Sequence, residues 1–216
     1  MHTPLLRRRD FTLSLLAFAA GGFAPSARSA KVRRILVVGD SLSAEYGLAR
    51  GTGWVALLQQ QLDKELPGTE VINASISGET TSGGRSRLAA LLQKHQPSHV
   101  LIELGGNDAL RGLPLDMTRD NLQTMAAQAK TAGAQVLLLG MQMPPNYGPQ
   151  ATRQFADMYT QIAKTHKAAL VPFFLQGVGD DADPLKWFQR DRIHPNEAAQ
   201  ARMLANVWPV LKKQLK

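Results

Sequence analysis

The sequence contains no cysteine, which excludes a cysteine nucleophile, a disulfide framework and a cysteine-ligated metal site. Its five histidines form neither an HExxH motif nor a comparable ligand pair, so no metal site is expected. No G-x-G-x-x-G or P-loop pattern occurs, which disfavours a nucleotide-binding Rossmann protein. Internal repeats and low-complexity stretches are also lacking. What is present is an ordinary globular composition, 44% hydrophobic and 19% charged, in 216 residues.

Basic residues outnumber acidic ones, and the formal charge is +8. The first 29 residues contribute a net +3 of this, so the body of the chain carries about +5. No basic run is interleaved with aromatic residues and no DNA-binding motif occurs, so we expect no nucleic-acid partner. A moderately basic soluble surface is the simpler interpretation. Attraction to acyl-phosphate substrates or to anionic lipid, as a weak contact with a membrane surface, is the alternative.

Residues 1–29 have the features of an export signal, which leaves residues 30–216 as one domain. Three arginines, 7–9, are followed by an apolar stretch, 11–23, that is too short to span a bilayer comfortably. Arg8-Arg9-Asp10-Phe11 fits a twin-arginine pattern, while the general secretory route and an uncleaved anchor stay open. In each case we expect the mature protein outside the cytoplasm, in the periplasm or secreted.

Beyond the leader, short apolar runs alternate with helical patterns. The runs are nearly continuous in Val, Ile and Leu, as expected of strands that are covered on both faces. The expected strands are 34–38, 70–73, 99–104, 135–139 and 168–171. The expected helices are 54–66, 85–94, 116–132, 151–166 and 196–213, with Pro209 kinking or dividing the last one. This alternation predicts an α/β fold, in which helices cover both faces of a parallel sheet.

Polar residues of catalytic type follow the expected strands. Ser41, Gly78 and Asn107 come after the first, second and third strands, and Asp191 and His194 lie in the long loop after the fifth. Ligands of such sheets bind beyond the carboxyl ends of the strands. We therefore expect these residues, which are distant in the sequence, to meet at one crevice.

Ser41, His194 and Asp191 are the residue types that serine-type acyl transfer requires. A serine hydroxyl needs a base, and an imidazole three residues from a carboxylate can be oriented by that carboxylate. The structural alternatives are that Ser41 caps a short turn and that Asp191-x-x-His194 begins a helix.

Donors for an oxyanion are also present. Two glycines precede Asn107 and allow the backbone to approach a ligand closely. The Asn107 amide and the backbone N–H groups of Gly78 and Ser41 would form an oxyanion hole. A simple turn cap is the alternative for Asn107. We interpret Asp40 and Asp108 as hydrogen-bond acceptors that hold the loops.

Four blocks in this order resemble the SGNH (GDSL) hydrolases, and the likeness covers nearly all of residues 33–212. The blocks are Gly39-Asp40-Ser41-Leu42-Ser43, Ile76-Ser77-Gly78-Glu79-Thr80, Gly105-Gly106-Asn107-Asp108 and Asp191-Arg192-Ile193-His194-Pro195-Asn196. The nearest likeness is to the family's periplasmic acyl-CoA thioesterases and lysophospholipases.

The resemblance implies a three-layer α/β/α flavodoxin-like sandwich of five parallel strands and a serine esterase or thioesterase without a cofactor. It implies Ser41 as nucleophile, His194 as base, Asp191 as its partner, and Gly78 and Asn107 as oxyanion donors. We also expect a monomer that acts on a small acyl ester or thioester. A carbohydrate O-acetyl esterase and a non-catalytic binding module on the same fold are the competing functions.

Two positions depart from the family pattern. Glu45 stands where a small residue is expected and could alter the rim of the site, and Glu79 replaces an expected Asp. In the subgroup that this chain resembles, the loop after the Asn block, here 109–114, shapes the acyl site. An apolar groove or, alternatively, ordinary loop packing is predicted for Leu110, Leu113, Met143, Pro144 and Ile193.

Overall fold

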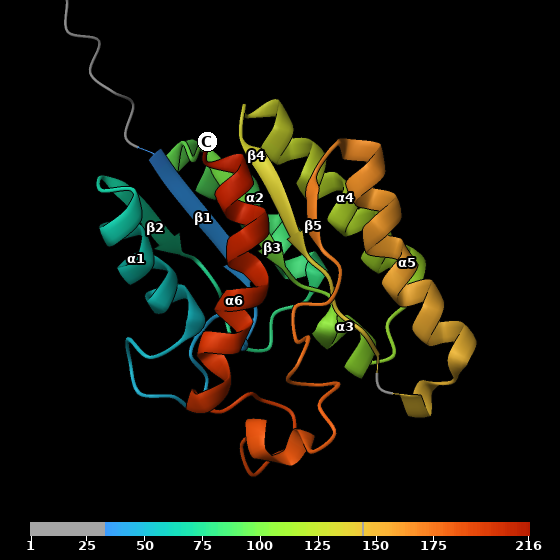
Figure 1. Cartoon of the computed structure of the whole chain (residues 1–216). Coiled ribbons are helices and arrows are strands. Elements are labelled where there is room, and N and C mark those ends of the chain that lie inside the picture. Colours follow the sequence, from blue (N-terminus) through green and yellow to red (C-terminus); the bar gives the residue numbers. More distant parts are fainter. Residues whose placement is uncertain (1–32, 144) are drawn as a thin grey trace, which may run out of the picture. The chain divides into compact units, whose positions relative to one another are not determined.

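A computed structural model describes residues 33–143 and 145–216, so the expected leader, 1–29, lies outside the described residues. Five parallel strands form one sheet in the order β2-β1-β3-β4-β5 (Figure 1). The strands are β1 (Arg33–Gly39), β2 (Thr69–Asn73), β3 (His99–Glu103), β4 (Gln135–Leu139) and β5 (Ala169–Val171). The five predicted strands are confirmed to within one residue, and the order is the flavodoxin-like one.

Helices cover both faces of this sheet, which confirms the predicted three-layer α/β/α architecture. They are α1 (Trp54–Glu65), α2 (Thr81–His95), α3 (Gly106–Leu110), α4 (Leu115–Thr131), α5 (Pro149–His166) and α6 (Glu197–Gln214), with short 3-10 helices η1 (Pro145–Tyr147) and η2 (Pro184–Trp187). Helices α1 and α6 pack together in one layer, and α4 packs against both α2 and α5 in the other (Figure 1). None of the helices in the described ranges has the length and apolarity that a bilayer crossing requires.

Two helix predictions need correction. Helix α2 begins at Thr81, earlier than expected, because the Thr80 hydroxyl accepts a hydrogen bond from the N–H of Gly83 and caps the helix despite two glycines in its first turn. The prediction that Pro209 could divide the last helix is wrong. Pro209 is exposed, while Val207 and Leu211 on either side are buried and hold α6 against the sheet.

The apolar runs of the sequence become the core of the sheet. The last five residues of β1 and all five of β3 are buried, and these two strands are neighbours in the middle of the sheet. Loops that follow β1 and β3 therefore start from the most completely packed part of the molecule. This packing fixes the backbone at the start of the segments that carry Ser41 and Asn107.

Candidate active site

The structure brings Ser41, His194 and Asp191 together in a continuous hydrogen-bonded chain. The Nε2 atom of His194 lies 2.9 Å from Ser41 Oγ, and its Nδ1 atom lies 2.6 Å from Asp191 Oδ2. Ser41 is buried, and the His194 side chain is 19% exposed, so the hydroxyl and the imidazole meet in a partly desolvated position. This arrangement can move a proton from the hydroxyl to the imidazole.

A closed loop presents His194 to Ser41. An antiparallel bridge joins Phe188 to Pro195, and the N–H of Gln189 donates to the His194 carbonyl at 2.8 Å. Inside the loop, Arg192 takes a left-handed conformation with φ 60°. This turn folds the carboxylate of Asp191 back onto the imidazole three residues later.

The Asp191 carboxylate is held by the backbone as well as by the imidazole. Its Oδ1 atom accepts the N–H groups of His194 at 3.0 Å and of Ile193 at 2.9 Å. These two backbone hydrogen bonds, followed by the His194 side chain, lower the pKa of Asp191 to about 2. The carboxylate therefore stays charged at neutral pH and can stabilise an imidazolium.

The ring of Tyr46 lies against the imidazole of His194. Its ring centroid lies 4.3 Å from that of His194 with 37° between the ring planes. Its backbone carbonyl accepts a hydrogen bond from the Gln189 side chain at 2.8 Å. The nucleophile loop and the histidine loop therefore support each other, a contact that no motif in the sequence indicates.

Glu45 holds the loop that carries Tyr46. It has φ 59°, an uncommon conformation for a residue with a side chain, and its Oε1 atom accepts the N–H groups of Gly53 at 2.8 Å and Gly51 at 3.0 Å. Glu45, which replaces the small residue expected at this position, therefore acts as a clamp on its own loop. The carboxylate faces its own loop, because these two glycine N–H groups are its partners.

Two backbone N–H groups of the predicted oxyanion hole are available as donors. Those of Ser41 and Gly78 donate to no acceptor within the described ranges. Gly78 has φ 78°, which favours glycine, and its carbonyl accepts a hydrogen bond from Arg111 at 2.7 Å. Arg111 thereby holds the peptide group that follows Gly78.

The Asn107 side chain reaches the same region but is already engaged. Its Nδ2 atom donates to Asp40 Oδ2 at 2.9 Å and to the Glu79 carbonyl at 3.1 Å. An oxyanion would have to share one of these N–H groups in a three-centre hydrogen bond. The contacts of Asn107 hold the second and third blocks of the sequence close to the first.

Asp40 and Asp108 are both acceptors, as predicted. Asp40 Oδ1 accepts the N–H of Leu42 at 3.0 Å, which shapes the turn around Ser41. The buried Asp108 accepts both the N–H and the hydroxyl of Thr81 and so joins the third block to the start of α2.

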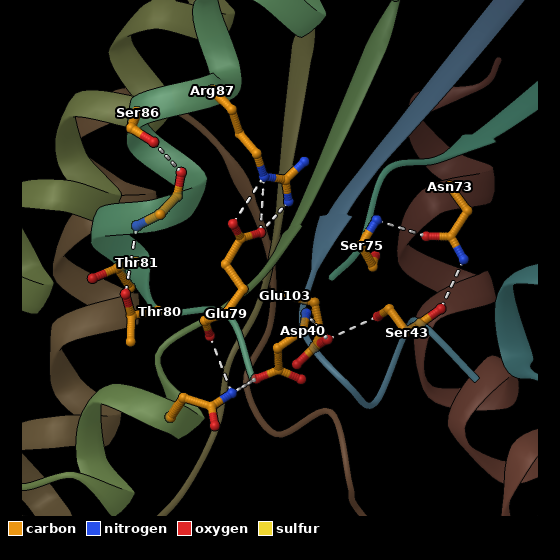
Figure 2. A network of polar contacts seen from close by, with 12 residues as sticks. Asp40, Ser43, Asn73, Ser75, Glu79, Thr80, Thr81, Ser86, Arg87 and Glu103 are labelled. Atoms are coloured by element: carbon orange, nitrogen blue, oxygen red, sulfur yellow. Dashed lines mark hydrogen bonds and ion pairs between the residues drawn. The ribbon is translucent and has the colours of Figure 1, made fainter. Parts of the chain in front are cut away.

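A third buried carboxyl, Glu103, contacts Asp40 and Ser43 of the nucleophile turn (Figure 2). Its Oε2 atom accepts the Ser43 hydroxyl at 2.7 Å and the N–H of Asp40 at 3.2 Å, whereas its Oε1 atom is buried without a partner. Burial, followed by the charge of Asp40, raises the pKa of Glu103 well above its usual range. Burial also raises the pKa of Asp40 to about 6, although hydrogen bonds from Leu42 and Asn107 oppose this shift.

Glu103 is therefore the carboxyl of this pair that keeps its proton, because it is completely buried and only one of its two oxygens accepts hydrogen bonds. Sequence reasoning missed it. The signal was a charged residue at the end of an otherwise apolar strand, because a carboxyl is rarely buried unless it is paired.

Glu79, the other departure from the family pattern, also acts within the scaffold. Its carboxylate forms a bidentate ion pair with Arg87 of α2 (Figure 2). The pair is largely buried, and it anchors the loop that follows Gly78 to the helix.

The predicted apolar groove is only partly reproduced. A cavity of about 220 Å³ lies between the α3–α4 region and the start of α5, and Leu113 and Met143 line it together with Tyr147 and Phe155. Leu110 and Ile193 do not line this cavity and are instead about half exposed. Pro144 lies outside the described residues.

Comparison with known proteins agrees with the fold. A family model described as "GDSL-like Lipase/Acylhydrolase family" matches residues 37–202. "Esterase TesA" of Pseudomonas aeruginosa is 52% identical over 188 residues, which cover 87% of this chain and 92% of that protein. "Thioesterase 1/protease 1/lysophospholipase L1" of Escherichia coli K12 is 43% identical over 173 residues, 80% of each chain.

Solved structures give the same picture. The crystal structure of TesA superimposes with a TM-score of 0.80 at 52% identity and covers 84% of this chain and 99% of that one. The family match extends from the end of β1 into α6 and includes all four sequence blocks. This chain belongs to the GDSL-like lipase/acylhydrolase family, the SGNH hydrolases.

Proposed function

We propose that this protein is a serine hydrolase that cleaves acyl esters or thioesters through an acyl-enzyme on Ser41. One observation carries the proposal: His194 lies 2.9 Å from Ser41 Oγ with one ring nitrogen and 2.6 Å from Asp191 with the other. The names of the relatives, an esterase and a thioesterase/lysophospholipase, support the same substrate class.

In the first half-reaction, Ser41 Oγ attacks the acyl carbon while its proton passes to His194 Nε2. The oxyanion accepts hydrogen bonds from the N–H groups of Ser41 and Gly78 and from the Asn107 amide. Asp191 keeps the imidazole in the tautomer whose Nε2 is free to accept. Collapse of the intermediate breaks the bond to the alcohol or thiol, which leaves with the proton from His194.

In the second half-reaction, water gives a proton to His194 and attacks the acyl-enzyme. The new tetrahedral intermediate uses the same donors, and its collapse returns the proton from His194 to Ser41 Oγ and releases the carboxylic acid.

The cavity that Leu113 and Met143 line supports an acyl group with an apolar chain. Most of its lining residues are apolar, and one of them, Ala109, lies two residues after Asn107 in the sequence. An acetylated sugar would leave a volume of about 220 Å³ largely unused. We therefore favour acyl esters and thioesters over carbohydrate O-acetyl esters.

The direct test uses Ser41→Ala with Ser82→Ala as the control, because Ser82 is an exposed serine of α2. A fluorophosphonate probe should label the wild type and Ser82→Ala but not Ser41→Ala, and p-nitrophenyl butyrate hydrolysis should fall by about 10⁴-fold or more only in Ser41→Ala. Undiminished turnover by Ser41→Ala would refute the mechanism. A preference for acetyl-xylan over p-nitrophenyl esters of four to ten carbons would refute the substrate class.

We further propose that residues 1–29 direct export and that the mature protein is a monomer outside the cytoplasm. The arginines at positions 7–9 and the apolar stretch that follows support export. Cell fractionation with N-terminal sequencing tests export and cleavage, and an Arg8→Lys/Arg9→Lys variant that still reaches the periplasm would exclude the twin-arginine route. Light scattering of the purified protein tests the monomer.

A further inference from the structure

Exposed large apolar side chains are concentrated at one edge of the sheet. Within the described ranges there are seven of them, and every connection that follows a strand carries at least one. They are Tyr46 after β1, Ile76 after β2, Leu110 and Met117 after β3, Tyr147 after β4, and Leu185 and Ile193 after β5. All five connections leave the carboxyl ends of parallel strands, which is the edge of the sheet where Ser41 and His194 meet (Figure 1).

The opposite edge carries none of them. There, short connections at 66–68, 96–98, 132–134 and 167–168 join helices to strands without an exposed large apolar residue. Exposed apolar residues scattered singly over a surface are normal, but their gathering on one face marks an interaction surface. We call the seven residues the apolar collar.

Positive charge accompanies the collar. Arg50, Arg111, Arg190 and Arg192 are exposed in the same connections, and none forms an ion pair with a carboxylate in the described part of the chain.

Most carboxylates of these connections are already engaged. Glu45 binds backbone N–H groups, Glu79, Asp116 and Asp181 form ion pairs with Arg87, Arg119 and Lys186, and Asp191 is hydrogen-bonded to His194. Asp180, Asp183 and Glu197, the last in the first turn of α6, are the exposed carboxylates of this edge without a cationic partner among the described residues. Four guanidinium groups without a carboxylate partner therefore outnumber three carboxylates without a cationic partner at this edge, although Arg111 also donates to the Gly78 carbonyl.

We propose that the apolar collar docks this edge of the protein on the surface of an anionic phospholipid bilayer. Apolar side chains enter the boundary between headgroups and acyl chains, and guanidinium groups bind the phosphates. A second copy of the chain would meet the same four cations, so charge favours lipid over self-association. Docking would point the opening around Ser41 towards acyl lipids, but it does not depend on the proposed hydrolysis.

The test is co-sedimentation of the Ser41→Ala protein with vesicles of phosphatidylcholine alone or mixed equally with phosphatidylglycerol. The inactive variant prevents lipid hydrolysis, so a failure of the proposed chemistry leaves the assay unaffected. We expect binding to the mixed vesicles, weakening as salt rises from 50 to 500 mM, and little binding to phosphatidylcholine.

Variants separate the collar from bulk charge. Leu185→Ser/Met117→Ser and Arg50→Glu/Arg190→Glu should each weaken vesicle binding about tenfold, because they remove insertion and phosphate contacts respectively. The matched control is Lys64→Glu/Lys130→Glu, which makes the same charge change at the ends of α1 and α4. It should bind nearly as the parent does, and all variants in the Ser41 background should keep the parent's thermal unfolding temperature within a few degrees.

Three outcomes would overturn the proposal. They are equal binding to both kinds of vesicle, equal weakening by the lysine control, and a dimer in light scattering that Leu185→Ser/Met117→Ser dissociates. The last would assign the collar to contact between copies of the chain. With an intact Ser41, the collar variants provide a further readout: hydrolysis of soluble p-nitrophenyl acetate should not change in Leu185→Ser/Met117→Ser.

Discussion

At the amino edge of the sheet, two or three residues join each helix to the next strand, whereas at the carboxyl edge the connections reach the length of residues 172–196. Each short connection only reverses the direction of the chain. The longer connections carry Ser41, Gly78 and His194, and Asn107 lies in the short helix α3 that follows β3. One sheet therefore supports two edges that differ in what their residues contribute.

Both edges contain residues in the left-handed conformation, but for different purposes. Gln96 and Lys167 end α2 and α5 at the amino edge, where they only stop a helix. Glu45 and Arg192 take the same conformation at the carboxyl edge, where they place Tyr46 and His194. Such a conformation costs about 1–2 kcal/mol in either place. At the carboxyl edge this cost secures the geometry of the site.

Removal of one side-chain amide should distinguish most strongly a residue that acts in catalysis from one that only stabilises the fold. Asn107→Ala should lower kcat about 10²–10³-fold, because it removes an oxyanion donor. Asn206→Ala is the matched control, since its Nδ2 atom also makes two hydrogen bonds to carbonyls, those of Phe174 and Gln176. Both variants should lose about 1–2 kcal/mol of unfolding free energy. Steady-state kinetics with p-nitrophenyl butyrate tests this, and equal losses of kcat would remove the distinction.

A buried carboxyl pair at the carboxyl edge and an exposed carboxylate at the amino edge should make stability depend on pH in opposite directions. The pKa of Glu103 is raised on folding, so its contribution to stability is full below about pH 4 and falls as pH rises. Asp40, whose pKa is raised to about 6, acts in the same direction between about pH 4 and 6. Glu103→Gln keeps the shape of the side chain but cannot ionise. Its unfolding free energy relative to that of the wild type should therefore rise by about 1–3 kcal/mol between pH 4 and pH 8.

Glu65, at the end of α1, provides the opposite case. A hydrogen bond from Lys212 lowers its pKa, so its contribution is present above about pH 4.5 and is lost in acid. Glu65→Gln should therefore lose a little stability at neutral pH and none at low pH. Urea unfolding of both variants from pH 3 to pH 8 measures the difference, and parallel curves would show that the Glu103 carboxyl is not held in its neutral form.

The strain at Glu45 should appear as a difference between two substitutions. Glu45→Ala keeps a side chain at φ 59° and loses the clamp on Gly51 and Gly53, so we expect a loss of about 2 kcal/mol. Glu45→Gly loses the same clamp but removes the strain, so we expect a loss about 1 kcal/mol smaller. Chemical denaturation of the two variants measures this. If they are equally stable, the left-handed conformation is not costly there.

At the amino edge, relief of the same strain should have the smallest effect and no functional consequence. Gln96 is exposed at the end of α2 with φ 45°, so Gln96→Gly should raise the unfolding free energy by about 0.5–1 kcal/mol. The esterase rate should not change. Thermal unfolding with a parallel activity measurement checks both expectations, and a lower melting temperature would show that the Gln96 side chain supports the helix end.

The strands and the four blocks could be read from the sequence because each is a local pattern. Apolar runs of four to six residues specify the strands to within one residue, and the parallel topology then brings Ser41 and His194 to one edge. The start of α2 was missed because glycine propensity is a weak signal that one capping hydroxyl overrides.

By itself, the sequence determined the α/β class, the order of its elements and the residue types at the carboxyl edge, because periodicity and motifs are local properties of the chain. Only the tertiary structure decided that the Tyr46 ring packs against His194, that Glu103 is buried beside the nucleophile turn, and that Glu45 turns inward to its own loop. These contacts depend on side-chain direction and burial, which arise only when distant segments pack against one another and exclude water.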